Sequence, residues 1–261
     1  MRVVATALLT TMGIPGGLAQ SSRAQTTSAP IIAVASDLQF ALTDVTEAFR
    51  AETGHTVRLS FGSSGNFARQ LRQGAPFELF LSADEAYVED LARDGVMRDA
   101  GVLYAIGRLA LFVPKGSRVV ADANLDDLAA ALADGRLKKF AIANPEHAPY
   151  GRRAEEALRH RGVWDAIKDR LVLGENVSQA AQFATSGNVD AGLISYAHVL
   201  SPKVAALGTF ALIPDTWHRP IRQRMALMKT AGPVAQSFYA FTQAPAARAI
   251  LRKHGFALPG E

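Results

Sequence analysis

Short apolar runs alternate along the chain with segments of helical periodicity, beginning at Pro30. Val45, Ala48 and Phe49 recur at helical spacing, and Gly54 is expected to end that helix. Val57, Leu59 and Phe61 alternate with polar residues, which predicts a strand at residues 55–61. Further strands are predicted at residues 31–35, 78–82, 109–114, 140–143, 171–173, 191–195, 210–213 and 222–228. Further helices are predicted at residues 64–73, 84–93, 125–132, 150–161 and 178–185, with two closing helices within 233–253.

This alternation of strand and helix predicts an α/β protein built from βαβ units, in which each sheet is mainly parallel and flanked by helices. The units fall into two groups, which indicates two lobes. We expect lobe I to comprise residues 27–108 plus 218–261 and lobe II residues 109–217. Two crossover segments, near 108–113 and near 214–222, are expected to form the hinge. Ligands of such sheets bind beyond the carboxyl ends of the strands, so the interlobe cleft is the expected site.

The first residues of the chain differ in composition from the rest. Arg2 gives a positive start, and residues 3–19 are uncharged and mostly small or apolar. Small residues then occupy the positions that a signal peptidase reads, which predicts a signal peptide over residues 1–24, cleaved near Ala24 or Ala19. A membrane anchor is the alternative, but the apolar run is short and interrupted by glycine and proline. We therefore predict export to the periplasm.

Composition excludes several classes of protein. Half of the residues are hydrophobic (49%) and 20% are charged, which is typical of a globular protein with a substantial core. The absence of cysteine excludes a lipoprotein anchor, disulfides and a thiol nucleophile. The net charge of +4 is spread along the sequence, without a basic run or interleaved aromatic and basic residues. Nucleic-acid binding is therefore not expected.

Four predicted strand-to-helix junctions have the chemistry of an anion site, at residues 35–38, 62–66, 145–151 and 175–178. A helix N-terminus leaves backbone N–H groups unpaired and carries about half a positive charge. Several such ends aimed at one point bind an anion without lysine or arginine. Each junction alone is more often an ordinary cap or turn, so only the repetition of the pattern at four junctions indicates an anion site.

The motifs at these junctions carry a family resemblance. They are VASDL at 34–38, SFGSSGNFARQL at 60–71, APFELFLSAD at 75–84, ANPEHAPYG at 143–151, ENVSQA at 175–180 and GLISYAHV at 192–199. With these motifs, residues 31–256 resemble the periplasmic molybdate-binding proteins of ABC transporters. The resemblance implies a two-lobed periplasmic-binding-protein-like (type II) fold. It also implies that the protein captures molybdate or tungstate and delivers it to the membrane permease of an ABC importer.

The resemblance also implies which residues bind the oxyanion. Ser36 and Ser64 would each give a hydroxyl and a backbone N–H, and Val177 would give a backbone N–H from the second lobe. Tyr150 occupies the third junction, where some members have alanine and others tyrosine. Ser195 departs from the pattern, because many members place there a tyrosine whose phenol reaches the anion. Tyr150 is the candidate for the donor that is missing at Ser195.

Asp37 has two interpretations, because a carboxylate beside a dianion is unfavourable unless it turns away or is protonated. The side chain can point outward and cap the following helix while its N–H faces the ligand, and we favour this interpretation. Alternatively, the carboxylate accepts a proton from a ligand that carries one, which would suit hydrogen phosphate. Molybdate and sulfate carry no proton at neutral pH.

Other functions are weaker candidates. The chain lacks the P-loop, metalloprotease and nucleophile-elbow motifs, and its six histidines are scattered without paired spacing. His147 is the one that falls in a junction, where we expect a loop role. Another tetrahedral oxyanion, sulfate or phosphate, is the nearest alternative ligand, and an enzyme or sensor on the same fold ranks lower. We expect a monomer that needs no catalytic residue and no cofactor.

Overall fold

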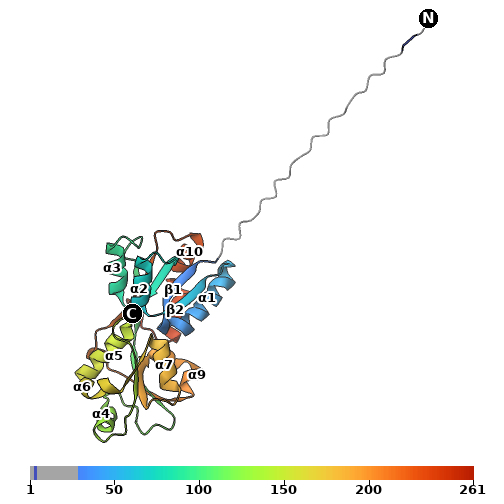
Figure 1. Cartoon of the computed structure of the whole chain (residues 1–261). Coiled ribbons are helices and arrows are strands. Elements are labelled where there is room, and N and C mark those ends of the chain that lie inside the picture. The colour runs from blue at the N-terminus through green and yellow to red at the C-terminus, as the bar shows by residue number, and fades with distance from the viewer. Residues whose placement is uncertain (1–2, 5–28) are drawn as a thin grey trace.

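The computed structural model describes residues 3–4 and 29–261 of the chain. The predicted signal peptide at residues 1–24 thus lies outside the described residues, apart from Val3 and Val4. Figure 1 shows two lobes joined at a waist, with α1, α2, α3 and α10 on one lobe and α4 to α7 and α9 on the other. None of the helices within the described ranges has the length and apolar character to cross a membrane.

The first lobe is built on a five-stranded sheet of order β2-β1-β3-β10-β4. Its strands are β1 (Ile31–Ala35), β2 (Arg58–Gly62), β3 (Leu79–Ser82), β4 (Val102–Gly107) and β10 (Ile221–Leu227). β1 pairs in parallel with β2 and β3, whereas β10 pairs antiparallel with β3 and β4. Four strands therefore run one way and β10 runs the other.

Helices cover both faces of this sheet, so its inner strands β1 and β3 are almost entirely apolar and buried, whereas β2 and β10 include polar residues. The helices of this lobe are η1 (Ser36–Leu38), α1 (Gln39–Thr53), α2 (Ser64–Arg72), α3 (Glu85–Arg93), α10 (Pro233–Thr242) and α11 (Pro245–Lys253). Along β1, Ile32 and Val34 belong to the core cluster shared with α1, α10 and α11. Ala33, between them, faces the cluster formed with α2 and α3. Both sets of side chains are buried completely, so β1 is fixed from both sides.

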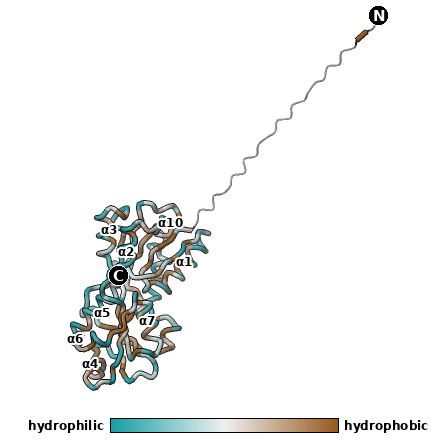
Figure 2. The backbone as a smooth tube through the Cα atoms, in the orientation of Figure 1, coloured by the Kyte–Doolittle hydropathy of each residue, from teal (hydrophilic) through white to brown (hydrophobic). Residues whose placement is uncertain are grey.

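The second lobe repeats the arrangement with a sheet of order β7-β6-β8-β5-β9. Its strands are β5 (Leu109–Pro114), β6 (Phe140–Ala143), β7 (Leu171–Gly174), β8 (Ala191–Ser195) and β9 (Gly208–Leu212). Its helices are α4 (Asp126–Ala133), α5 (Pro149–His160), α6 (Trp164–Ile167), η2 (Lys168–Arg170), α7 (Val177–Thr185), α8 (Tyr196–Leu200) and α9 (Pro202–Ala205). Here β5 is the strand that runs opposite to the other four. Figure 2 shows the hydrophobic strands inside each lobe and hydrophilic residues toward its outside.

The predicted fold class is confirmed, with differences where the chain passes between lobes. The sequence did not indicate β4, because its apolar run continues through Arg108 into β5. The first crossing is confined to Arg108, since residues 109–114 are strand and pair on both sides. The expected hinge over 108–113 was therefore too long. The return crossing lies between β9 and β10 and contains η3 (Asp215–Trp217). The lobe limits 27–108 plus 218–261 and 109–217 remain a proposal, drawn at these two crossings.

Candidate functional site

A small cavity lies between the two lobes, with a volume of about 10 Å³. That is far less than the roughly 300–1,000 Å³ of pockets for drug-sized ligands, so the cavity leaves room for a small guest at most. Its lining comes from both lobes and consists of Ala35, Ser36, Asp37, Gly62, Ser63, Ser64, Ala83, Ala148, Pro149, Tyr150, Asn176 and Val177. All four predicted junctions therefore contribute to one cavity.

The junctions meet because each follows the carboxyl end of a strand. Ser36 follows β1 and Ser64 begins α2 just after β2, both on the first lobe. Tyr150 is the second residue of α5, and Val177 is the first residue of α7. The N–H groups of Ser64 and Val177 have no partner within their own helices, because the first four N–H groups of a helix never do. Two helix N-termini from opposite lobes thus open on the cavity.

The hydroxyls of Ser36 and Ser64 are oriented by bonds that they accept. Ser64 Oγ accepts a hydrogen bond of 3.0 Å from the N–H of Ala83, and its side chain is fully buried. Ser36 Oγ accepts one of 3.3 Å from the N–H of Ser178 on the other lobe. A hydroxyl that accepts from a backbone N–H keeps its own hydrogen to donate. Both serines can therefore donate to a guest in the cavity.

Asp37 is not an outward-pointing cap, so the interpretation that we favoured from the sequence is wrong. Its side chain is 1% exposed and caps neither η1 nor α1. Asp37 Oδ2 accepts hydrogen bonds from the phenol of Tyr150, at 3.1 Å, and from Nε2 of Gln223 on β10. Asp37 Oδ1 is buried and has no hydrogen-bond partner. The carboxyl is turned inward by partners on two other elements.

Burial controls the protonation of this carboxyl. Loss of hydration raises the pKa of Asp37 to about 6, although Gln223, Tyr150 and the backbone N–H groups of Asp37 and Leu38 lower it in part. Burial and the nearby carboxyl also raise the pKa of the Tyr150 phenol, so this phenol stays a donor. Asp37 forms no ion pair with a lysine, arginine or histidine within residues 29–261. The carboxyl is held by neutral groups alone.

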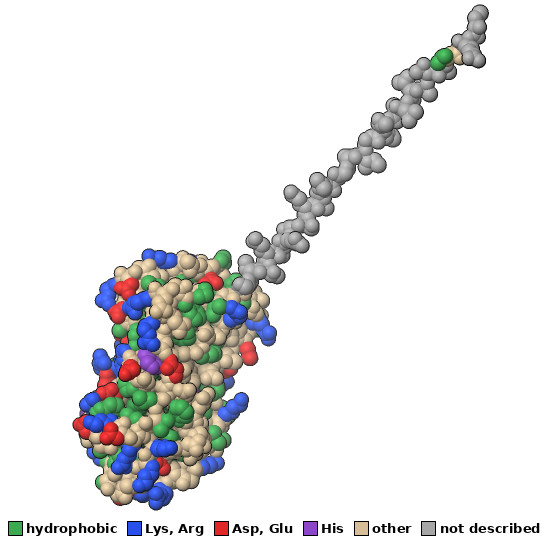
Figure 3. Space-filling model, in the orientation of Figure 1, with side chains coloured by type: hydrophobic (Ala, Val, Ile, Leu, Met, Phe, Trp, Pro, Cys, Tyr) green, Lys and Arg blue, Asp and Glu red, His purple; other side chains and the backbone are tan. Residues whose placement is uncertain are grey.

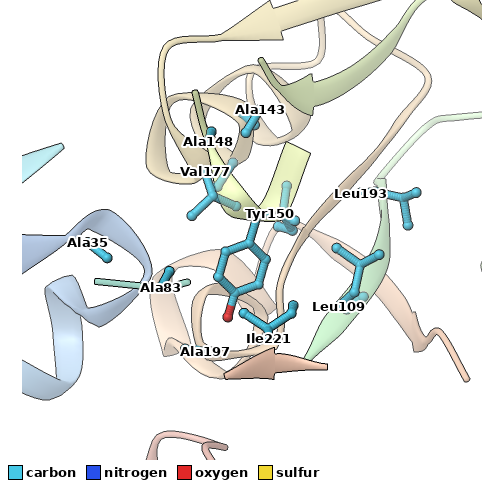
Figure 4. Packing of buried hydrophobic residues seen from close by; sticks show 14 of the residues in the cluster. Ala35, Ala83, Leu109, Ala143, Ala148, Tyr150, Val177, Leu193, Ala197 and Ile221 are labelled. Atoms are coloured by element: carbon cyan, nitrogen blue, oxygen red, sulfur yellow. The ribbon is translucent and has the colours of Figure 1, made fainter. Parts of the chain in front are cut away.

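Tyr150 lines the cavity, but its phenol is engaged. Figure 4 shows the ring among Ala35, Ala83 and Val177, with its oxygen on the side of Ile221, the first residue of β10. The oxygen donates to Asp37 rather than standing free in the cavity. We predicted that the phenol of Tyr150 supplies the donor that is missing at Ser195. This geometry does not support that prediction, because the phenol is bonded to Asp37. The backbone N–H of Tyr150 remains its available donor.

Ser195 is not among the residues that line the cavity. It ends β8, and its Oγ accepts from the backbone N–H of His198, which caps α8. The same oxygen lies 2.6 Å from His198 Nδ1. The hydroxyl is thus committed to a helix cap and to an imidazole, and the structure does not bring it to the other predicted site residues.

Among the cavity residues, Ala83 lies outside the four predicted junctions, and six others lie within the junctions but were not predicted as ligands: Ala35, Gly62, Ser63, Ala148, Pro149 and Asn176. Ala83 follows β3, so it ends a third strand of the first sheet, but its apolar side chain gave no chemical signal. Asn176 caps α7 by accepting from the N–H of Gln179, at 3.1 Å. Its position before a helix was the available signal, since asparagine is a preferred N-cap.

The loop that carries His147 contacts the first lobe at Ser63 and Gly65. The backbone oxygen of His147 accepts from the N–H of Gly65, at 2.9 Å, and its Nδ1 lies 3.0 Å from Ser63 Oγ. A Cβ on Gly65 would lie 2.6 Å from that backbone oxygen, so a glycine is needed for this approach. The expected loop role of His147 thus includes direct contact between the lobes.

A second set of interlobe contacts lies around Ser178 of α7. Ser178 Oγ donates to the backbone oxygen of Ser36, at 2.9 Å, and lies 2.8 Å from His198 Nε2. Burial lowers the pKa of His198 to about 4, so its imidazole is neutral at physiological pH. Elsewhere on the seam, Arg153 forms an ion pair with Asp84 at 3.2 Å. These contacts hold the lobes together without entering the cavity.

The chemistry of the cavity is that of an anion site without a basic side chain. Its lining contains hydroxyls, helix N-termini and one carboxyl, and neither lysine nor arginine. Within the described part of the chain, no three histidine, aspartate or glutamate side chains are grouped as a metal site. Figure 3 shows basic and acidic side chains interspersed over the visible face, without a large patch of either sign.

Comparisons with known proteins agree with this geometry. A family model described as bacterial extracellular solute-binding protein matches residues 31–257. The chain is 34% identical to the molybdate-binding protein ModA of Rhodobacter capsulatus, over 98% of this chain and 96% of that protein. It is also 34% identical to ModA of Azotobacter vinelandii, over 87% of this chain and 89% of that protein. The solved periplasmic molybdate-binding protein of Azotobacter vinelandii matches with a TM-score of 0.79 and 30% identity, covering 88% of this chain and 99% of that one.

Proposed function

Because this chain belongs to the bacterial extracellular solute-binding proteins, we propose that it captures molybdate or tungstate in the periplasm and delivers it to an ABC importer. The relatives named above support the choice of ligand, because they are molybdate-binding proteins and the match covers 96%, 89% and 99% of their lengths. The single observation that carries the proposal is the meeting of strand-to-helix junctions from both lobes around one small cavity. The protein is proposed to bind and deliver, without catalysis and without a cofactor.

The donors in the cavity suit a dianion with four oxygens. Ser36 and Ser64 are proposed to donate their hydroxyls and backbone N–H groups from the first lobe. Tyr150 and Val177 are proposed to donate backbone N–H groups from the second. Each hydrogen bond to a charged partner contributes about 1.5–3 kcal/mol, and the two helix ends add a favourable field. These neutral donors would replace the hydration of the anion as the lobes close. They contact its oxygens and not the metal atom.

Closure of the lobes is proposed to couple binding to delivery. The chain crosses between the lobes only at Arg108 and between β9 and β10, within residues 29–261. A hinge at two strand crossings permits the lobes to separate and close, as two-lobed binding proteins do. The closed monomer, with the anion buried, is then the form proposed to dock on the permease.

Hydrogen phosphate is a second candidate ligand, because one observation favours it. Asp37 lines the cavity and its Oδ1 has no partner, so this oxygen can accept a proton that the anion carries. Sulfate shares the charge and shape of molybdate but has no such feature in its favour. Similarity to the molybdate-binding relatives ranks molybdate and tungstate first.

Calorimetry with a series of anions tests the proposal. The purified protein is titrated at pH 6 and at pH 8 with molybdate, tungstate, sulfate and phosphate, each as the same counterion salt. We expect saturable binding of molybdate and tungstate at one site per chain, and weaker or no binding of sulfate. Tight binding of phosphate alone would identify phosphate, and not molybdate, as the ligand. No binding of any of the four anions would refute an oxyanion site.

A further inference from the structure

Asp37 is the residue that a site for a fully ionised oxyanion does not explain. It lines the cavity together with Ser36 and Ser64, the two proposed hydroxyl donors. Its Oδ2 is satisfied by Tyr150 and Gln223, whereas its Oδ1 is buried without a partner. A buried polar atom without a hydrogen bond is costly, and one beside an anion site indicates a role toward the ligand.

The groups around Asp37 are neutral donors, and the backbone N–H groups of Asp37 and Leu38 also favour its ionised form. From α5 the facing group is the phenol of Tyr150, and from β10 it is the amide of Gln223. Behind Gln223, the phenol of Tyr104 on β4 donates to that amide at 2.8 Å. From α7 the neighbour is Ser178, which bonds to the backbone oxygen of Ser36, and from α8 it is the neutral His198, whose ring bonds to Ser178 and Ser195. No cation faces the carboxyl from any of these elements.

An ionised carboxyl in this place would repel a dianion at close range in a medium of low polarity. A protonated carboxyl has the opposite effect. Its Oδ2 still accepts from Tyr150 and Gln223, while its Oδ1–H becomes a further neutral donor. Asp37 is therefore a neutral donor, like the other groups that line the cavity, only when a proton lies between its Oδ1 and the anion.

We propose that the cavity binds its oxyanion together with one proton, which is shared between Asp37 Oδ1 and an oxygen of the anion. This inference rests on the proposed function and concerns how that site selects its guest. When an anion without a proton binds, such as molybdate, Asp37 takes up one proton from solvent in the same step. Hydrogen phosphate brings its own proton, which it donates to the ionised carboxyl. The proton balance therefore differs between the two anions.

The direction of the pH dependence follows from the free carboxyl. Burial raises the pKa of Asp37 to about 6, so the protonated form is abundant below pH 6 and falls tenfold for each pH unit above it. The dissociation constant for molybdate should then be nearly constant below pH 6. Between pH 7 and pH 9 it should rise about tenfold per pH unit. A purely structural role of Asp37 would give no such slope.

Asp37→Asn is the matched variant, because its amide keeps an acceptor for Tyr150 and Gln223 and places an uncharged donor at the position of Oδ1. Glu47→Gln is the control, since it removes an exposed carboxylate from α1 of the same lobe. Molybdate is titrated into all three proteins by calorimetry at pH 6, 7, 8 and 9. Each titration is repeated in two buffers of different ionisation enthalpy, which counts the protons taken up, and with phosphate in place of molybdate.

We expect the wild-type protein and Glu47→Gln to take up about one proton per molybdate at pH 8, and fewer with phosphate. Asp37→Asn should take up none and bind molybdate at pH 8 at least tenfold more tightly than the wild type. Molybdate binding by the wild type with no proton uptake and no pH slope would overturn the inference and leave the proposed function intact. A folded Asp37→Asn that loses binding would also overturn it, and if that variant does not fold, the wild-type proton count decides. Absence of molybdate binding at every pH would instead refute the proposed function.

Discussion

The phenol of Tyr150, on the second lobe, donates a hydrogen bond of 3.1 Å to Asp37 Oδ2, on the first. The two residues are 113 positions apart in the sequence, and both line the cavity. This bond favours the ionised form of the carboxyl and partly offsets the effect of burial. Because the bond joins the two lobes, lobe closure affects the charge of Asp37, the one acidic side chain in the cavity.

Tyr150→Phe should raise the pKa of Asp37 further above its present value of about 6, because the bond that favours the ionised form is lost. A charged hydrogen bond contributes about 1.5–3 kcal/mol, which corresponds to about one to two pH units. The pH at which molybdate affinity begins to fall should move upward by that amount. Tyr239→Phe, on α10 outside the cavity, is the control. An unchanged or lower midpoint for Tyr150→Phe would contradict the role given to its phenol.

Ser64→Ala should weaken oxyanion binding, because the fully buried Ser64 hydroxyl already accepts from Ala83 and has only its hydrogen to donate. The loss of one hydrogen bond to a charged partner costs about 1.5–3 kcal/mol, or about ten- to a hundredfold in the dissociation constant. Calorimetric titration with molybdate measures it. Ser60→Ala, on β2 before the junction, should bind as the wild type does. Equal affinities of the two variants would remove Ser64 from the site.

Ser178→Ala should weaken binding without removing a cavity residue, because Ser178 Oγ bonds across the lobes to the backbone oxygen of Ser36. A neutral hydrogen bond contributes about 0.5–1.5 kcal/mol, so the dissociation constant should rise about two- to tenfold. Stopped-flow measurements should show faster dissociation of the anion and a nearly unchanged association rate. Ser186→Ala, an exposed serine at the end of the same helix, is the matched control. A slower association with unchanged dissociation would count against a closure role.

Asp37→Asn should stabilise the ligand-free protein at pH 8. The folded protein holds the proton of Asp37 more tightly than the unfolded chain does, because its pKa rises from 3.8 to about 6. The free energy of unfolding therefore falls by a total of about 3 kcal/mol as the pH rises from 4 to 6, and it stays at the lower value above pH 6. The variant does not lose this stability, because its amide does not ionise. Urea unfolding should show the variant more stable at pH 8 by up to about 3 kcal/mol and equal to the wild type near pH 4, whereas a pH-independent difference would exclude this cause.

Much of the fold was predictable because both sheets are covered by helices on two faces. Continuous apolar runs such as residues 31–35 and 140–143 appear as β1 and β6 with the predicted bounds. β4 was missed for a physical reason. It joins β5 through Arg108 alone and belongs to a different sheet, so no tight turn with its sequence signature separates the two strands.

The candidate site was predictable where the signal is local and not where it is long-range. The junctions of Ser36, Ser64 and Val177 are strand-to-helix steps that can be identified in a few residues, and the structure brings them together. The orientation of Asp37 depends on Gln223, which is 186 positions away, so no local pattern could reveal it. Ser195 was assigned by resemblance, and its hydroxyl is bound to His198 instead.

Anomalous diffraction from crystals grown with tungstate tests the central claim most directly, because tungsten marks the anion without ambiguity of position. We expect one strong peak per chain inside the cavity, with anion oxygens within hydrogen-bond distance of Ser36 Oγ, Ser64 Oγ and the N–H of Val177. A peak elsewhere, or an anion bound mainly by arginine and lysine side chains, would contradict it.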